Sequence, residues 1–103
     1  MSTPEAAAAV AWATSALTAL AILATLIAAV RIVRGPRHAD RVVALDIFLA
    51  AAVALCVAAS LNTGRTVFLD VAIGLALVGF VATIGWARLI ERSAPSDAAE
   101  PKR

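Results

Sequence analysis

The first apolar stretch of the chain is residues 6–30, which read AAAAVAWATSALTALAILATLIAAV and contain no charged side chain. At about 1.5 Å per residue, a helix of this length spans a hydrocarbon core about 30 Å thick with some tilt. Thr3, Pro4 and Glu5 supply an N-cap, a first helical position and a first-turn acid. The first basic residue, Arg31, follows the stretch, whereas a cleaved signal peptide carries basic residues in front. A retained transmembrane helix is therefore predicted.

The composition of the whole chain is that of a membrane protein. Of its 103 residues, 62% are apolar and 16% charged, and the mean hydropathy is +0.92. At about 20 residues per span, this length allows at most four spans and one small domain. The single cysteine, Cys56, lies inside an apolar run and is predicted to be a packing residue. Water-soluble enzymes are therefore largely excluded.

A second apolar run, residues 42–61, follows a loop that contains Gly35 and Pro36. We expect Gly35 to end the first helix in the left-handed conformation, and Pro36 cannot continue the helical hydrogen bonds. Asp40 is placed to cap the second helix. Asp46 is the one acid inside this run. The second run is therefore predicted to be another transmembrane helix.

The third apolar run covers residues 67–87 and follows a short turn at residues 62–65. Thr66 is its predicted N-cap, and Asp70 lies in its first turns. The last segment, residues 93–103, mixes small, charged and proline residues and is predicted to be a disordered tail. The sequence thus predicts an all-α integral membrane protein with three transmembrane helices.

The basic residues are distributed unequally between the two ends of the predicted helices. The loop at residues 31–41 holds four arginines and the segment 88–103 holds four basic residues. The N-terminal flank has none, and the second loop has only Arg65. Positive charge is retained on the cytoplasmic side of a membrane. We therefore expect the three-helix domain, residues 1–92, to have its N-terminus outside and its C-terminus in the cytoplasm.

Each predicted helix carries a stripe of small and polar residues. The stripes are Thr14, Thr18, Ala21, Thr25 and Ala28 on the first helix, Asp46, Ala50, Val53, Val57 and Ser60 on the second, and Asp70, Gly74, Gly85 and Arg88 on the third. Small residues let membrane helices approach closely. Packing of the three helices against one another is the simplest interpretation of the first stripe, while the aspartates of the other two also allow a functional face.

Asp46 and Asp70 are the acids inside the predicted spans. A carboxylate at the centre of a span costs about 2.5 to 3.5 kcal/mol and usually faces protein, a partner or water. The two lie near opposite edges, about 6 Å and about 4.5 Å inside, and are not expected to share a site. For Asp46 we consider an ion pair with Arg88 or a place on an ion or proton path. For Asp70 we consider a favourable helix N-terminal position beside Arg65, or a functional role.

The sequence lacks the motifs of common catalytic and cofactor sites. It has no glycine-rich phosphate loop, no paired cysteines or histidines at metal-ligand spacing, and no nucleophile with a nearby base. We therefore expect no catalysis by this chain alone, no cofactor and no bound metal. The charges lie at the ends of apolar stretches, so nucleic-acid binding is not expected either. The remaining candidate functions are transport, pore formation and a structural role within a larger complex.

Two further segments are informative beyond their hydropathy. The first reads RGPRHADRVVALD at residues 34–46, and the second runs from FLDVAI at residues 68–73 through Gly79 and Phe80 to ARLIER at residues 87–92. Together they resemble the F subunit of the multisubunit Mrp-type (Mnh/Pha) monovalent cation/proton antiporters. The resemblance covers residues 31–92. Its most specific part is the spacing that joins a Gly-Pro loop to the start of the next helix.

The resemblance implies a small multi-pass subunit of a hetero-oligomeric complex in the bacterial inner membrane, which exchanges sodium or another monovalent cation for protons. The implied partners are the other antiporter subunits, including large ones similar to those of respiratory complex I, the lipid bilayer, and the transported cation and protons. The implied site residues are the motif loop and helix start, Gly35, Pro36, Asp40 and Arg41, and two ion-path candidates, first Asp46 and then Asp70.

Two other interpretations stay open on the sequence alone. A self-assembling pore former of the holin type has about this length and can place its N-terminus outside. Self-association does not require the Gly-Pro loop or the helix start that follows it, which favours the antiporter subunit. An anchor or assembly factor with no ion path of its own cannot be separated from the antiporter subunit by sequence.

Overall fold

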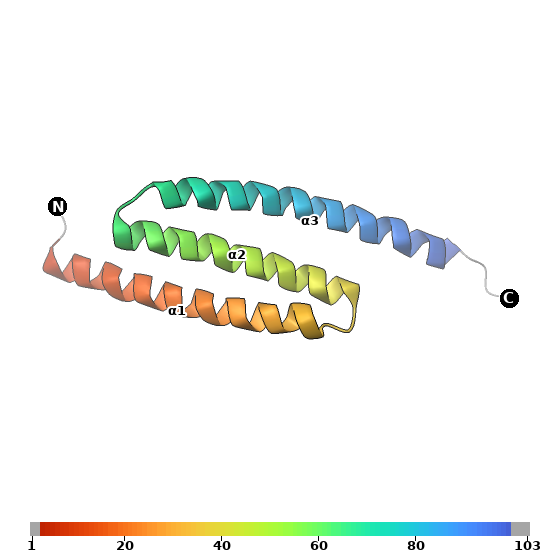
Figure 1. The fold of residues 1–103 in the computed structure, drawn as a ribbon, viewed down its shortest axis with the longest axis horizontal. Helices are drawn as coiled ribbons and strands as arrows, with labels where there is room; N and C mark the ends of the chain where they lie inside the picture. The colour runs from red at the N-terminus through yellow and green to blue at the C-terminus, as the bar shows by residue number, and fades with distance from the viewer. Residues whose placement is uncertain (1–2, 100–103) are drawn as a thin grey trace.

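The computed structural model describes the backbone of residues 3–99 and the side chains of residues 3–93. It contains three helices, α1 (Pro4–Arg34), α2 (His38–Thr63) and α3 (Val67–Ala99), and α2 runs antiparallel to the other two (Figure 1). Each helix is long and apolar enough to cross a membrane. The predicted all-α architecture with three apolar helices is confirmed.

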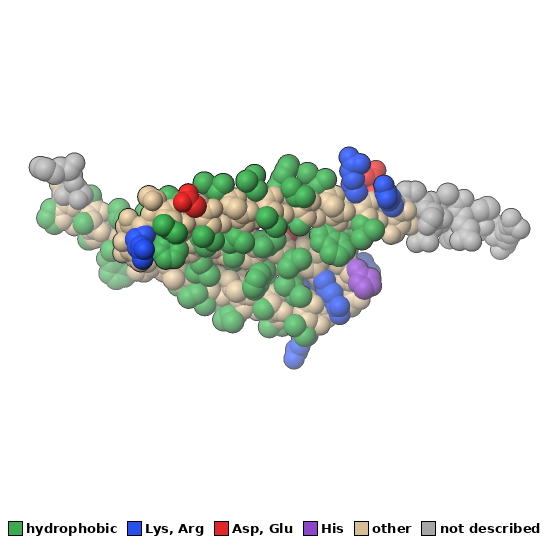
Figure 2. Space-filling model, turned by 45° about the horizontal axis from the view of Figure 1, so that its top comes forward, with side chains coloured by type: hydrophobic (Ala, Val, Ile, Leu, Met, Phe, Trp, Pro, Cys, Tyr) green, Lys and Arg blue, Asp and Glu red, His purple; other side chains and the backbone are tan. Residues whose placement is uncertain are grey.

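α2 lies between α1 and α3 and contacts both of them (Figure 1). Within the described part of the chain, no Cα atom of α1 lies within 8 Å of a Cα atom of α3. The helices therefore form an open row around α2. Large apolar side chains are widely exposed on this row, and Figure 2 shows them covering its middle.

The start of α1 is as predicted, whereas its end differs. Thr3 Oγ1 accepts a hydrogen bond from the Ala6 N–H at 3.2 Å. Gly35 ends the helix with φ −59° and ψ 123°, so the expected left-handed conformation at this residue is wrong. The left-handed glycine is Gly64, with φ 69°, whose N–H donates to the Ser60 carbonyl at 2.8 Å at the end of α2. A missing Cβ makes that conformation inexpensive for glycine.

The start of α2 lies earlier than expected. The helix begins at His38, its N-cap is Arg37, and no side chain caps it. The prediction of Asp40 as the N-cap is therefore wrong. Asp40 lies in the first turn, where the positive end of the helix dipole still favours an acid. At α3 the expected position of Thr66 is correct, because its carbonyl accepts from the Leu69 N–H at 2.9 Å.

α3 extends past the predicted third span. The helix continues to Ala99, through residues that we expected in a disordered tail beginning at residue 93. The three alanines of this extension favour a helix, whereas its Pro95 lacks the N–H that a helix interior uses. Residues 100–103 of the predicted tail lie outside the described residues.

The helices contact one another through small side chains spaced seven residues apart. The buried positions with this spacing are Thr14, Ala21 and Ala28 on α1, Ala44, Ala51 and Ala58 on α2, and Ala72 and Gly79 on α3. Ser60 of α2 is also buried. A seven-residue repeat keeps one narrow seam of a helix facing its neighbour. Small side chains in that seam allow the backbones to approach closely, which is how membrane helices gain packing energy in an apolar solvent.

The stripe predicted on the first helix forms the α1 side of this contact. Its alanines and Thr14 are buried, and Thr18 and Thr25 are half-buried. The three threonine hydroxyls donate to carbonyls four residues earlier in α1, at 2.7 to 2.8 Å. Because their hydrogen bonds stay within α1, this stripe contacts α2 through van der Waals packing alone. The packing interpretation of this stripe is confirmed.

The stripe predicted on the third helix lies away from α2. Asp70, Gly74, Gly85 and Arg88 are all exposed. A Cβ built on Gly74 or Gly85 would have nothing within 4 Å. α3 instead turns Ala72 and Gly79 inward, so packing within the chain does not explain this stripe. The exposed stripe is available to a neighbour outside the chain.

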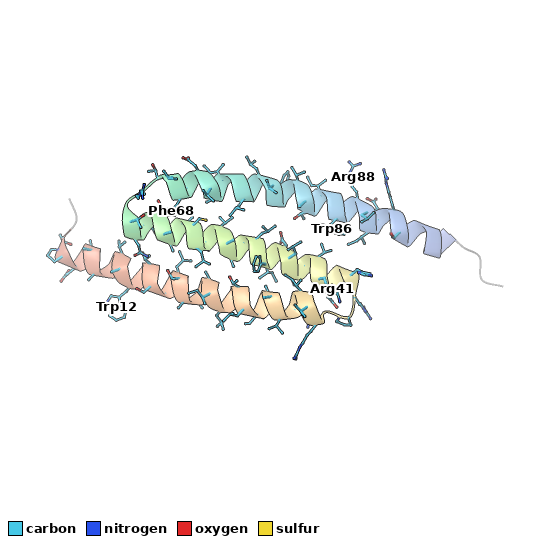
Figure 3. The ribbon with its side chains drawn as sticks, viewed as in Figure 1. Trp12, Arg41, Phe68, Trp86 and Arg88 are labelled. Atoms are coloured by element: carbon cyan, nitrogen blue, oxygen red, sulfur yellow. The ribbon has the colours of Figure 1, made fainter. Side chains whose placement is uncertain are left out.

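The two tryptophans lie toward opposite ends of the row. Trp12 of α1 is 78% exposed and points away from α2 (Figure 3). Trp86 of α3 is 40% exposed. Trp12 lies about 28 Å along α1 from Arg31, which matches the thickness of the hydrocarbon core. Tryptophans are typical of the membrane–water interface, so these two side chains indicate where the bilayer begins and ends.

The α1–α2 contact predicts a strong dependence on side-chain size at Ala21. Ala21→Leu should destabilise the purified full chain by about 1 to 3 kcal/mol, because the added carbons have no space at a close helix contact. Ala19→Leu is the matched control, since Ala19 is exposed on the same helix. Thermal unfolding in detergent, followed by circular dichroism, measures the difference. Equal stability of the two variants would contradict the proposed tight contact.

Candidate functional site

Asp46 lines a groove of about 460 Å³ between α2 and α3. The groove is lined by Asp46, Leu49, Ala50 and Val53 of α2 and by Leu75, Ala76, Gly79, Phe80 and Thr83 of α3. The stripe predicted on the second helix therefore faces α3 over this part of its length. Asp46 and Thr83 supply the polar side chains of an otherwise apolar groove.

The hydroxyl of Thr83 lies between two acceptors. Thr83 Oγ1 is 2.9 Å from the Gly79 carbonyl oxygen and 3.3 Å from Asp46 Oδ1. A hydroxyl carries one hydrogen and two lone pairs. When the hydrogen is donated to the nearer carbonyl, a lone pair of Thr83 faces the carboxylate of Asp46. Thr83 Oγ1 can then accept a hydrogen bond from a protonated Asp46, or both oxygens can coordinate one cation.

Backbone packing brings α3 close to α2 beside Asp46. Gly79 is buried in the seam one turn before Thr83. A Cβ built on Gly79 would lie 3.5 Å from Leu49 Cδ1, which is an ordinary contact distance. Asp46 lies about 12 Å along α2 from His38, well inside the helix. The carboxyl group thus lies along the apolar part of α2, on the exposed side of its contact with α3.

Arg88 is not brought to Asp46. Figure 3 shows Arg88 pointing away from α2, and among the described residues the salt bridge is that of Arg31 with Asp40. Thr83 faces Asp46 in place of the arginine, and it is not among the residues predicted from the sequence. The available signal was that Thr83 is the one hydroxyl residue in the apolar run at residues 67–87.

Asp70 occupies a separate place. It is exposed in the first turn of α3. Thr83 follows it by thirteen residues, which is about 20 Å along the helix axis. Asp70 therefore cannot share a site with Asp46, and its position at a helix start is electrostatically favourable for an acid.

The Gly-Pro motif forms the corner between α1 and α2. The Gly35 N–H donates to the Arg31 carbonyl at 2.7 Å. Arg41 Nε donates to the Gly35 carbonyl at 3.1 Å, and Figure 3 shows Arg41 at this end of α2. An Arg31 guanidinium nitrogen lies 4.0 Å from Asp40 Oδ1. These contacts tie the end of α1 to the first turn of α2.

Gly35 is required by space. A Cβ built on it would lie 2.7 Å from the Arg31 carbonyl oxygen and 3.1 Å from Arg41 Cγ. The first distance is shorter than side chains tolerate, and the obstructing atom belongs to the backbone. Any other residue would therefore shift the corner and, with it, the register of α2 against α1.

The site is built on a single carboxylate. Among the described residues, no group of three or more histidine, cysteine, aspartate or glutamate side chains could hold a metal ion. Cys56 is a half-buried free thiol in α2. The chemistry of the groove is therefore that of one carboxyl group, one hydroxyl oxygen and neighbouring backbone carbonyls.

Comparison with known proteins identifies the family. The sequence profile of multiple resistance and pH regulation protein F (MrpF / PhaF) matches residues 39–91. The chain belongs to the MrpF / PhaF family. The match includes Asp46, Asp70 and Thr83, and it begins at Ala39, three residues after Pro36. The resemblance read from the two sequence segments is confirmed, and this MrpF / PhaF member is a multi-pass protein of the bacterial membrane.

Two bacterial relatives extend this match over most of the chain. The F subunit of a probable K(+)/H(+) antiporter from Rhizobium meliloti (strain 1021) is 31% identical over 84 residues, which cover 82% of this chain and 91% of the relative. The F subunit of a Na(+)/H(+) antiporter from Bacillus subtilis (strain 168) is 33% identical over 76 residues, which cover 72% of this chain and 81% of the relative. No solved structure matches the chain significantly.

The corner predicts a specific need for glycine at position 35. Gly35→Ala should destabilise the purified full chain by about 1 to 3 kcal/mol, because its Cβ overlaps the Arg31 carbonyl. Gly74→Ala is the matched control, since nothing lies within 4 Å of its Cβ position. Thermal unfolding in detergent compares the two variants. An unchanged unfolding temperature for Gly35→Ala would show that the corner has room for a Cβ.

Proposed function

We propose that this chain is a small membrane subunit of a hetero-oligomeric monovalent cation/proton antiporter. Membership of the MrpF / PhaF family supports this function, as do two relatives that are both named as F subunits of antiporters. One relative is named for K(+) and the other for Na(+), so a monovalent cation is the substrate class they share. These names favour a transporter subunit over an enzyme and over a self-assembling pore.

The groove at Asp46 is the observation that supports a direct role of this chain in ion transport. A carboxylate in an apolar groove binds either a proton or a cation, and binding of one neutralises the charge that holds the other. Hard monovalent cations prefer oxygen ligands of the kind that Asp46, Thr83 and the Gly79 carbonyl supply. Competition at one carboxyl group is the basic chemistry of cation/proton exchange.

The partners of this chain follow from its open shape. One carboxylate and one hydroxyl offer few ligands, so neighbouring subunits, including large complex-I-like ones, would complete the ion path. The exposed stripe of Asp70, Gly74, Gly85 and Arg88 on α3 presents small and charged residues of the kind found at membrane helix interfaces. This chain would then contribute to the ion path through Asp46 and to assembly of the complex through the α3 stripe, which would contact another subunit.

Substitutions in the groove test the transport role. Asp46→Asn should leave the complex assembled and reduce cation/proton exchange severely, because the amide cannot bind a proton or balance a cation. Thr83→Val should weaken apparent cation affinity by about tenfold, the effect of losing one interaction of about 1 to 1.5 kcal/mol. Exchange is measured with a pH-sensitive dye in inverted vesicles, and assembly by co-purification of the other subunits.

The matched control for Thr83→Val is Thr25→Val, because the Thr25 hydroxyl also donates to a carbonyl four residues earlier, at 2.7 Å, but lies in the α1–α2 contact. It should leave exchange unchanged. An assembled Asp46→Asn complex that exchanges ions at the normal rate would assign Asp46 to structure alone. Loss of assembly in Arg88→Ala would assign Arg88 a structural role.

We also infer that the N-terminus lies outside and the C-terminus in the cytoplasm. This orientation is supported by the excess of basic residues at one end of the row, where α1 ends, α2 begins and the apolar run of α3 ends. Figure 2 shows basic side chains gathered at this end around the histidine. Single cysteines at Glu5→Cys and Arg92→Cys, in a Cys56→Ala background, report the orientation. A membrane-impermeant maleimide should label position 5 in intact cells and position 92 only after permeabilisation, and the opposite pattern would reverse the orientation.

A further inference from the structure

A second groove, of about 760 Å³, opens between α1 and α2 next to the Gly-Pro corner. Leu26, Ile27 and Val30 of α1 and Val43 and Ile47 of α2 line it. Where the two helices touch in this groove, Ala28 and Ala44 also line it, and they are 3% and 2% exposed. Seven of the ten lining residues are apolar, as expected for a surface that contacts hydrocarbon.

The rim of this groove is charged. Arg31, Arg34 and Asp40 lie on it. Asp40 is 4.0 Å from Arg31 and balances that charge. Arg34 forms no salt bridge within the described part of the chain. With Arg37 and Arg41 nearby in the sequence, the corner keeps an excess of positive charge that a negatively charged group would complement.

The length of the groove matches one leaflet of a bilayer. From Leu26 to Arg34 the groove extends about 12 Å along α1. Half of a hydrocarbon core is about 15 Å thick. A partner helix packed along α1 and α2 would use a seam that continues across the membrane, whereas one acyl chain needs only the depth of a single leaflet. The combination of a short apolar groove and a basic rim therefore fits a lipid better than a helix.

We propose that this groove binds one anionic phospholipid from the leaflet at the arginine end. An acyl chain lies between α1 and α2, and the phosphate lies at Arg34 and Arg31. Guanidinium groups bind phosphate oxygens through paired hydrogen bonds, and basic pockets between membrane helices bind anionic head groups. The bound lipid would stabilise the Gly-Pro corner, which sets the register of α2 against α1. This inference does not depend on antiport activity.

Photo-crosslinking tests which molecule occupies the groove. A photoreactive p-benzoylphenylalanine replaces Val43, which lines the groove and is 60% exposed. The matched control replaces Val33, which is 75% exposed on the same end of α1 and does not line the groove. The full chain, in its assembled complex, is reconstituted in phosphatidylcholine vesicles that contain a minor fraction of phosphatidylglycerol. Mass spectrometry should find phosphatidylglycerol enriched on position 43 and not on position 33.

Charge substitutions test the head-group contact. Arg34→Gln should lower the phosphatidylglycerol adduct at position 43 about five-fold, the effect of about 1 kcal/mol for one arginine near a membrane surface. Arg92→Gln, which removes an exposed arginine of α3 outside the groove, should leave the adduct unchanged. Adducts with another protein subunit, equal labelling by both lipids, no lipid adduct at position 43, or equal effects of the two arginine variants would each overturn the proposal.

Discussion

Close contact between α2 and its two neighbours depends on small side chains placed along narrow seams. Lipid is as apolar as leucine, so burying large apolar residues gains little inside a membrane, and helices associate through tight packing of their backbones. Ala44, Ala51 and Ala58 recur every seven residues on α2 and are buried. The large apolar side chains lie outward, where they contact lipid at no cost. The protein is thus assembled around alanine and glycine.

The position of Asp46 follows from this packing and from the Gly-Pro corner. A helix rotates its side chains by about 100° per residue, so a shift of one residue in α2 would turn Asp46 away from α3. Gly35 and Arg41 fix the start of α2 against the end of α1. The segment from Gly35 to Asp46 therefore joins a structural corner to a carboxylate that lies about two helical turns beyond the start of α2. Structure and proposed transport chemistry share one short segment.

The open row explains why such a small chain would act within a complex. α1 and α3 do not contact each other within the described residues, and α3 carries an exposed stripe with two glycines and two charges. A closed bundle would hide these surfaces. The open arrangement leaves one groove beside the carboxylate, another beside the arginines, and a helix face suited to a neighbouring subunit.

Local patterns in the sequence were enough to determine three apolar helices, the Thr3 cap, the packing stripe of α1 and the family motif. Hydropathy, capping and helical periodicity each depend on residues close together in the chain. Only the tertiary structure decided that Thr83 faces Asp46, that Arg88 does not, and that the α3 stripe is exposed. Those features depend on the register and rotation of one helix against another, which arise from contacts between residues far apart in the sequence. For the same reason the sequence did not show why residue 35 must be glycine, because that need comes from the limited space between the end of α1 and the start of α2.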